Sequence, residues 1–116
     1  MQKTIAFCLF NYFTYGGLQR DMLRIALACQ RAGASIRVYT MQWDGPHPDG
    51  FDIRIVPTQG RTNHGRAEQF AAQVQRLLIA EPVSLVVGHN RMPGLDIYFA
   101  SDVCYVEKIR TKHPLY

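Results

Sequence analysis

Two consecutive glycines mark the first segment of this chain that could do chemistry. The segment Tyr15-Gly16-Gly17-Leu18-Gln19-Arg20-Asp21 joins an apolar run to a stretch with helical periodicity. Glycine lets a backbone approach a ligand closely, and a helix N-terminus offers unpaired N–H groups and positive potential to an anion. The segment matches neither the Gly-x-Gly-x-x-Gly fingerprint nor a phosphate-binding loop with Gly-Lys-Ser/Thr. Two interpretations therefore stand, a phosphate site and a tight turn between a strand and a helix.

A second polar segment, 88–96, carries His89, Asn90, Arg91 and Asp96. Amide and carboxylate groups suit sugar hydroxyls, and arginine suits phosphate. The alternative is a solvated loop with a local Asx turn.

Three further candidates are Asp102, His64 and Arg66. Asp102 is either a site carboxylate or the N-cap of a following helix, and its position alone favours the cap. His64 and Arg66 are expected near a polar loop at 60–65 from which they could reach the same site, although loop histidines are more often merely solvent-exposed. The chain has no Ser-His-Asp spacing, Cys-x-x-Cys or His-x-x-x-His, so it indicates neither a nucleophilic triad nor a zinc site.

The elements that must position these residues follow from periodicity. Residues 3–10 are almost all apolar, which is typical of a strand buried on both faces of a parallel sheet. Apolar residues recur every three or four positions over 18–32 and 67–78, which predicts two amphipathic helices ending at Gly33 and before Pro82. Further strands are predicted at 35–40, 51–56 and 83–88, with a short one at 96–100 and a weak helix at 105–112.

Turn-forming residues predict a turn over 11–17 and surface loops over 43–50 and 60–65. Pro57 ends the strand at 51–56 and favours a place near an edge. Strands that alternate with helices predict an α/β fold, a Rossmann-like doubly wound parallel sheet. Ligands bind such sheets at the carboxyl ends of the strands, where the candidate segments lie.

Composition agrees with a folded chain. Its 116 residues are 47% apolar, enough for one small core, and no apolar run approaches the roughly 20 residues of a membrane-spanning helix. The 13 basic and 9 acidic residues give a net charge of +4, which permits anionic partners without choosing among them. Three widely spaced cysteines favour a reducing compartment.

Six segments in the same order closely resemble one family: 5–10, 15–21, 36–40, 62–66, 92–96 and 100–105. It is the lipopolysaccharide core glucosyltransferase I family (WaaG type), within the family 4 glycosyltransferases. Gly-Gly-Leu-Gln-Arg-Asp and Met-Pro-Gly-Leu-Asp are the most specific motifs. The resemblance implies a GT-B architecture of two Rossmann-like domains. Residues 1–116 would then be an incomplete amino-terminal, acceptor-side domain, without the donor-binding carboxyl-terminal domain.

The resemblance also implies an activity, the transfer of glucose from UDP-glucose to an inner-core heptose with retention at the anomeric carbon. Neither a metal nor a cofactor is expected, and the chain alone is expected to be inactive. Gly16, Gly17 and Asp21 would lie beside the donor phosphates, and Asp102 would face the reacting centre as the catalytic residue. The residues expected to line the acceptor cleft are His64, Arg66, Asn90, Arg91 and Asp96.

The expected partners are a nucleotide sugar, the lipopolysaccharide core acceptor and an anionic membrane surface, but no nucleic acid. Family members work in the cytoplasm as peripheral proteins of the inner membrane. Two alternatives are a stand-alone Rossmann-like module that binds a nucleotide or phosphate and a non-catalytic α/β domain that self-associates through exposed apolar surface.

Overall fold

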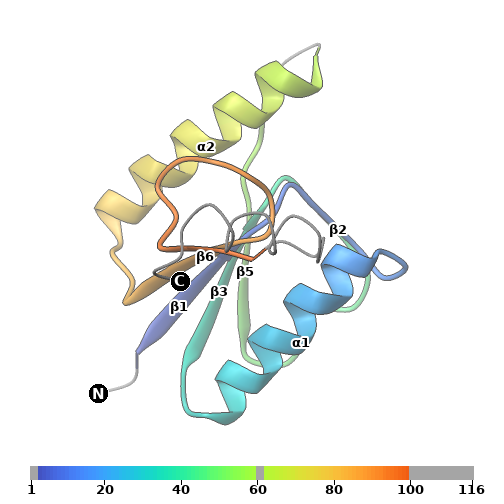
Figure 1. Cartoon of the computed structure of the whole chain (residues 1–116), viewed down its shortest axis with the longest axis vertical. Helices are drawn as coiled ribbons and strands as arrows, with labels where there is room; N and C mark the ends of the chain where they lie inside the picture. Colours follow the sequence, from blue (N-terminus) through green and yellow to red (C-terminus); the bar gives the residue numbers. More distant parts are fainter. Residues whose placement is uncertain (1–2, 60–61, 100–116) are drawn as a thin grey trace, which may run out of the picture.

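The structure is a computed structural model that describes residues 3–59 and 62–99. Its main sheet has five parallel strands in the order β5-β3-β1-β6-β7 (Figure 1). The strands are β1 (Thr4–Cys8), β3 (Ser35–Thr40), β5 (Phe51–Ile55), β6 (Leu85–Gly88) and β7 (Ile97–Tyr98). The chain moves outward from β1 through β3 to β5, then crosses back to pair β6 on the other side of β1. This order confirms the predicted Rossmann-like sheet, with β5 at one edge.

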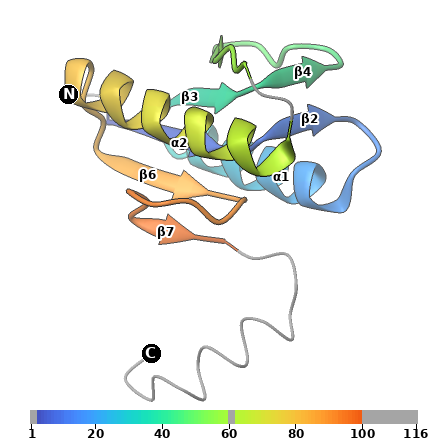
Figure 2. The same ribbon diagram turned by 90° about the horizontal axis from the view of Figure 1, so that it is seen from above.

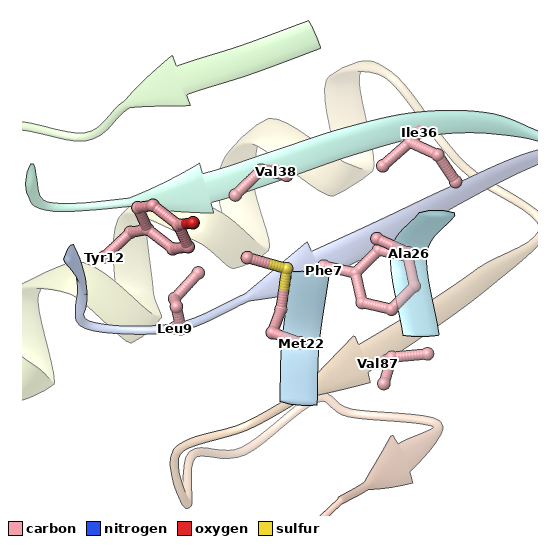
Figure 3. Packing of buried hydrophobic residues seen from close by; sticks show 8 residues of the cluster. All are labelled: Phe7, Leu9, Tyr12, Met22, Ala26, Ile36, Val38 and Val87. Carbon is pink, nitrogen blue, oxygen red and sulfur yellow. The ribbon is translucent and has the colours of Figure 1, made fainter. Parts of the chain in front are cut away.

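Two helices, α1 (Gly17–Arg31) and α2 (Asn63–Ala80), cover opposite faces of the sheet (Figure 1). Successive side chains of a strand point to opposite faces. Phe7 therefore packs with Met22 of α1 (Figure 3), whereas Ala6 and Cys8 pack with Phe70 of α2. The predicted burial of the first strand on both faces is confirmed.

The observed ends of the two helices confirm the predictions at Gly33 and Pro82 and correct the prediction of a loop over 60–65. Gly33 follows α1 with φ +105°, a left-handed conformation that suits glycine, and α2 ends at Ala80, before Pro82 as predicted. At the other end of α2, however, the hydroxyl of Thr62 accepts a hydrogen bond from the backbone N–H of Gly65 at 3.0 Å. Because this cap satisfies an otherwise unpaired donor, the helix begins at Asn63. The loop predicted over 60–65 is thus wrong from Asn63 onward.

A second, two-stranded parallel sheet of β2 (Asn11–Phe13) and β4 (Gln42–Asp44) continues past the carboxyl ends of β1 and β3 (Figure 2). The ring of Tyr12 stacks on that of Trp43 with 3.7 Å between their centroids. The turn predicted over 11–17 and the loop predicted over 43–50 are therefore wrong in part, because each segment supplies the other's hydrogen-bonding partner.

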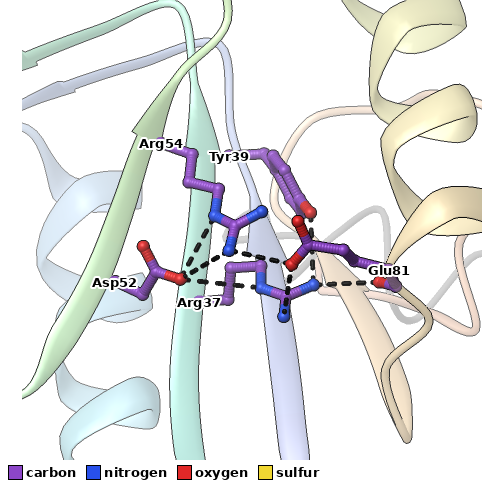
Figure 4. Close-up of polar contacts among 5 residues, drawn as sticks. All are labelled: Arg37, Tyr39, Asp52, Arg54 and Glu81. Carbon is purple, nitrogen blue, oxygen red and sulfur yellow. Dashed lines mark hydrogen bonds and ion pairs between the residues drawn. The ribbon is translucent and has the colours of Figure 1, made fainter.

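The end of α2 is tied to the sheet by charged side chains (Figure 4). Arg54 donates to both Asp52 and Glu81 at 3.0 Å, and Arg37 donates to the backbone carbonyl of Glu81 at 2.9 Å. Two guanidinium groups and two carboxylates thus balance one another beside β3 and β5 and join the end of α2 to these strands.

Neither described helix is long and apolar enough to cross a membrane. The predicted strand at 96–100 is observed only over Ile97–Tyr98. Asp102 and the predicted helix at 105–112 lie outside the described residues.

Candidate functional site

The candidate site lies at the carboxyl ends of β1 and β6, which are neighbours in the sheet. The chain leaves β1 toward α1 on one face, whereas it reaches β6 from α2 on the other face (Figure 2). The strand order reverses between β1 and β6, because β3 and β5 lie on one side of β1 and β6 lies on the other. Doubly wound sheets bind ligands in the crevice at such a reversal. The sequence-predicted segments around Gly16 and Asn90 both lie at this switch point.

The N-terminus of α1 is open to an anion. Gly16 is the N-cap residue, and among the described residues no side chain caps the helix. No acidic residue stands in its first turn. The positive end of the helix dipole is therefore left without a compensating negative charge, which favours an anionic ligand.

The two glycines differ in what the fold requires of them. A Cβ atom at Gly16 would collide with the Gln19 side chain and the Phe13 ring. Gln19 is held there because its amide donates to the carbonyl of Asn11 at 2.8 Å. A Cβ at Gly17 would meet nothing within 4 Å, and Gly17 is not among the glycines with positive φ. Packing thus explains Gly16, whereas Gly17 leaves open space on the outside of the helix start.

Asp21 and His89 lie near this crevice. Asp21 is half-buried one turn after Gly17. His89 is only 1% exposed and lies between the rings of Phe7 and Phe99, with centroid distances of 6.0 and 5.5 Å. Burial lowers the pKa of His89 to about 4, and the Asp21 carboxylate opposes that shift. His89 is therefore a neutral core residue at the switch point rather than the exposed loop group that the sequence suggested.

Within the part of the chain that the structure describes, neither ring nitrogen of His89 has a hydrogen-bond partner. Buried polar atoms without partners are costly, and they are rare in folded proteins. No signal in the sequence distinguished this histidine from the polar residues that follow it.

In the loop after β6, the side-chain oxygens of Asn90 and Asp96 accept hydrogen bonds from the backbone of the sheet region. The Asn90 side chain accepts a hydrogen bond from the backbone N–H of Phe10 at 2.7 Å. Asp96 accepts from the N–H of Val86 at 2.8 Å, and its own N–H donates to the Val86 carbonyl at 2.9 Å. Arg91 is exposed. Of these three predicted cleft residues, Asn90 lies at the switch point, and its oxygen joins β6 to β1.

A polar pocket of about 290 Å³ opens beside the small sheet. It is lined by Asn11, Tyr12, Phe13, Tyr15, Gln42, Asp44 and Arg66. Arg66, in the first turn of α2, was predicted from the sequence as a cleft residue, but its neighbours on β2 and β4 were missed. The sequence did contain a signal for these neighbours. Asn11 follows the apolar segment that contains β1, and Gln42 follows the apolar segment that contains β3. In the structure the two residues are paired.

The remaining predicted residues are placed as follows. The backbone of His64 lies in the first turn of α2, so it belongs to the helix and not to a loop. Asp102 lies outside the described residues. Within residues 3–59 and 62–99, no three His, Cys, Asp or Glu side chains gather in a way that would hold a metal ion.

No protein-family model matches the chain. Over 105 residues it is 51% identical to the lipopolysaccharide glucosyltransferase WaaG of Escherichia coli (strain K12), an alignment that covers 90% of this chain and 28% of WaaG. The crystal structure of WaaG, described as a glycosyltransferase involved in lipopolysaccharide biosynthesis, superposes with a TM-score of 0.84 at 50% identity. That match covers 93% of this chain and 29% of the WaaG chain. The chain thus spans less than a third of the length of these relatives.

These matches confirm the resemblance found in the sequence and the parallel α/β fold that it implied. In sequence and in fold, the chain is similar to part of the lipopolysaccharide glucosyltransferase WaaG.

Proposed function

We propose that this chain is the acceptor-side, amino-terminal part of a retaining GT-B glucosyltransferase. The whole enzyme transfers glucose from UDP-glucose to an inner-core heptose of lipopolysaccharide. The similarity to WaaG supports this assignment. The structural observation that carries it is Gly17, a glycine that neither backbone conformation nor packing requires, at an uncapped helix N-terminus beside the switch point.

In this proposal the start of α1 binds the donor diphosphate. The leaving diphosphate gains negative charge in the transition state, and backbone N–H groups at a helix N-terminus are already oriented to stabilise it. Gly17 leaves the space through which the phosphates approach the backbone, Gly16 is the N-cap residue at which the helix starts, and no metal is needed for this role. Asp21, one turn further on, offers a carboxylate to donor hydroxyls.

Asp102 is proposed to face the reacting centre. A carboxylate there would stabilise the positive charge that develops on the sugar ring as the leaving group departs. His64, Arg66, Asn90, Arg91 and Asp96 are proposed to lie along the acceptor side of the cleft.

The acceptor is carried on lipid, so the enzyme is proposed to work as a peripheral protein at the cytoplasmic face of the inner membrane. Arg20 and Arg24 are exposed on α1. Exposed arginines attract anionic headgroups or phosphorylated core sugars.

The proposal is tested with the chain alone and with a chimera in which it replaces the matching segment of E. coli WaaG. Glucosyl transfer needs the parts of the enzyme that this chain does not span. The chimera should therefore transfer glucose from UDP-glucose to heptose-terminated core, and the 116-residue chain should not. A folded chimera without transferase activity, or an active chain by itself, would contradict the proposal.

Gly17→Ala in the chimera tests the donor site directly. The added methyl group meets no protein atom but fills the space through which phosphates would approach. The KM for UDP-glucose should rise about tenfold or more, equivalent to about 1.4 kcal/mol of binding. Ala28→Ser is the matched control, because it also adds one atom to an exposed position of α1, about three turns further on. An unchanged KM in Gly17→Ala would remove α1 from the donor site.

A further inference from the structure

The pocket beside the small sheet has a rigid wall. Tyr12 is buried and stacks on Trp43, and the carbonyl of Asn11 accepts a hydrogen bond from the Gln19 amide. The pairing of β2 with β4 and this link to α1 fix the backbone on which the pocket is built. One wall of the pocket is thus held in place by contacts within the chain.

One side of the pocket is an exposed aromatic surface. The rings of Phe13 and Tyr15 lie 4.6 Å apart, centroid to centroid. Tyr15 is 79% exposed, about twice the value of Tyr98 or Phe99 at 38% each. The face of an aromatic ring carries partial negative charge, which attracts the weakly positive C–H groups on one face of a sugar ring.

The rest of the lining is polar and includes the side chains of Asn11, Gln42, Asp44 and Arg66. The Arg66 Nε group donates to the Thr58 hydroxyl at 3.3 Å. No hydrogen bond or ion pair from another described residue occupies the Asp44 carboxylate. Amides and a guanidinium group supply donors, and the amides and the carboxylate supply acceptors, so the set matches hydroxyl groups that both donate and accept.

Size and charge narrow the ligand class. A volume of about 290 Å³ is at the lower end for small-molecule sites, which suits one sugar ring better than a whole nucleotide. The Asp44 carboxylate and the Arg66 guanidinium carry opposite charges, so the charged side chains of the lining balance and do not select an anion. A neutral polyhydroxylated ring therefore fits better than an anion.

We propose that this pocket binds one sugar residue of the acceptor, with its C–H face on the Tyr15 ring and its hydroxyls on Asp44 and the two amides. This inference rests on the proposed function, because it names the substrate part that the acceptor side holds. Tyr15 directly precedes Gly16, so a sugar in the pocket lies next to the start of α1, where the donor phosphates are proposed to bind.

The first test is an NMR titration of the full chain with a heptose-containing core oligosaccharide from which the phosphates have been removed. Backbone signals of residues 11–15, 42–44 and 66 should shift. Asp44→Asn should weaken binding about tenfold or more, as expected for a lost hydrogen bond to a charged group. Asp49→Asn removes the same charge from an exposed loop position whose backbone carbonyl bonds the Gln30 amide near the far end of α1, so it should bind normally.

Tyr15→Ala is a second variant whose folding is not in question, because the side chain is mostly exposed. It should also weaken binding several-fold, whereas Ile79→Ala, which shortens another exposed apolar side chain far along α2, should not. Shifts confined to other residues, or normal binding by both Asp44→Asn and Tyr15→Ala, would overturn the subsite.

The chimera separates this inference from the proposed function. Asp44→Asn should raise the KM for the acceptor and leave the KM for UDP-glucose unchanged. If the chimera is active but its KM for the acceptor does not change in Asp44→Asn, the proposed sugar subsite is wrong and the proposed function stands. If the chimera is folded but inactive, the proposed function is wrong, whether or not the oligosaccharide binds to the isolated chain.

Discussion

The side-chain oxygen of Asn90 accepts a hydrogen bond from the backbone N–H of Phe10 at 2.7 Å. One residue earlier, the N–H of His89 donates to the carbonyl of Cys8 at 2.9 Å. Together these bonds continue the hydrogen bonding between β1 and β6 past the last paired residues. Asn90 therefore holds the two chain segments together at the switch point.

Asn90→Ala should destabilise the fold by about 1–2 kcal/mol, because it leaves the partly buried N–H of Phe10 without an acceptor. Asn90→Asp keeps an acceptor oxygen at the same place and should lose less. Urea unfolding of the three proteins checks both expectations. Equal stability of Asn90→Ala and the parent chain would show that the bond contributes nothing.

His89 should make the fold acid-sensitive in a defined window. Its pKa falls from 6.5 to about 4 on folding, so between these values the unfolded chain binds a proton that the folded chain does not. Stability is therefore lost as pH falls from 6.5 to 4, by up to about 3 kcal/mol. His89→Phe should abolish this part of the loss. The measurement is the difference between the two unfolding free energies at a series of pH values, and a constant difference contradicts the assignment.

The same substitution should stabilise the chain at pH 7 by about 1–2 kcal/mol. It replaces two buried nitrogens that have no partner among the described residues with apolar atoms in a ring of similar shape, beside Phe7 and Phe99. Thermal unfolding at pH 7 checks the sign, and a lower Tm for His89→Phe would show that the imidazole has a use in the folded state.

Glu81→Gln should lower stability at neutral pH and have little effect at strongly acidic pH. The hydrogen bond from Arg54 lowers the pKa of Glu81 below its ordinary value of 4.5, so the folded state favours the carboxylate. That stabilisation is present above pH 4.5 and is lost as pH falls through the folded-state pKa. High salt should also reduce it. Urea midpoints at pH 7 and pH 3 test this, with Asp49→Asn as a control outside the cluster.

Two glycine variants should have opposite effects on stability. Gly33→Ala should destabilise the chain by about 1–2 kcal/mol, because φ is +105° after α1. Gly17→Ala should leave stability unchanged or raise it by up to about 1 kcal/mol, because its φ is ordinary and the space is open. Urea unfolding compares the two. Destabilisation by Gly17→Ala would mean that the fold, and not a ligand, requires this glycine.

The main elements were predictable because their patterns are local. A continuous apolar run identified β1, a run rich in β-forming residues identified β3, and helical spacing identified α1 and α2. Gly33 and Pro82 marked where the two helices end. The same positions carry the motifs that resemble the glucosyltransferase family, so the sequence by itself determined the fold class and placed the candidate segments at the carboxyl ends of the strands.

Tertiary structure decided the features that depend on two distant segments. A three-residue strand such as β2 has too few residues for a periodic pattern, and it forms because β4 supplies its hydrogen-bonding partner. His89 and Asn90 look alike in the sequence as polar residues of one loop. Only the packing of β6 against β1 buries the first between aromatic rings and directs the oxygen of the second to Phe10, because burial and partner choice are set by neighbours in space.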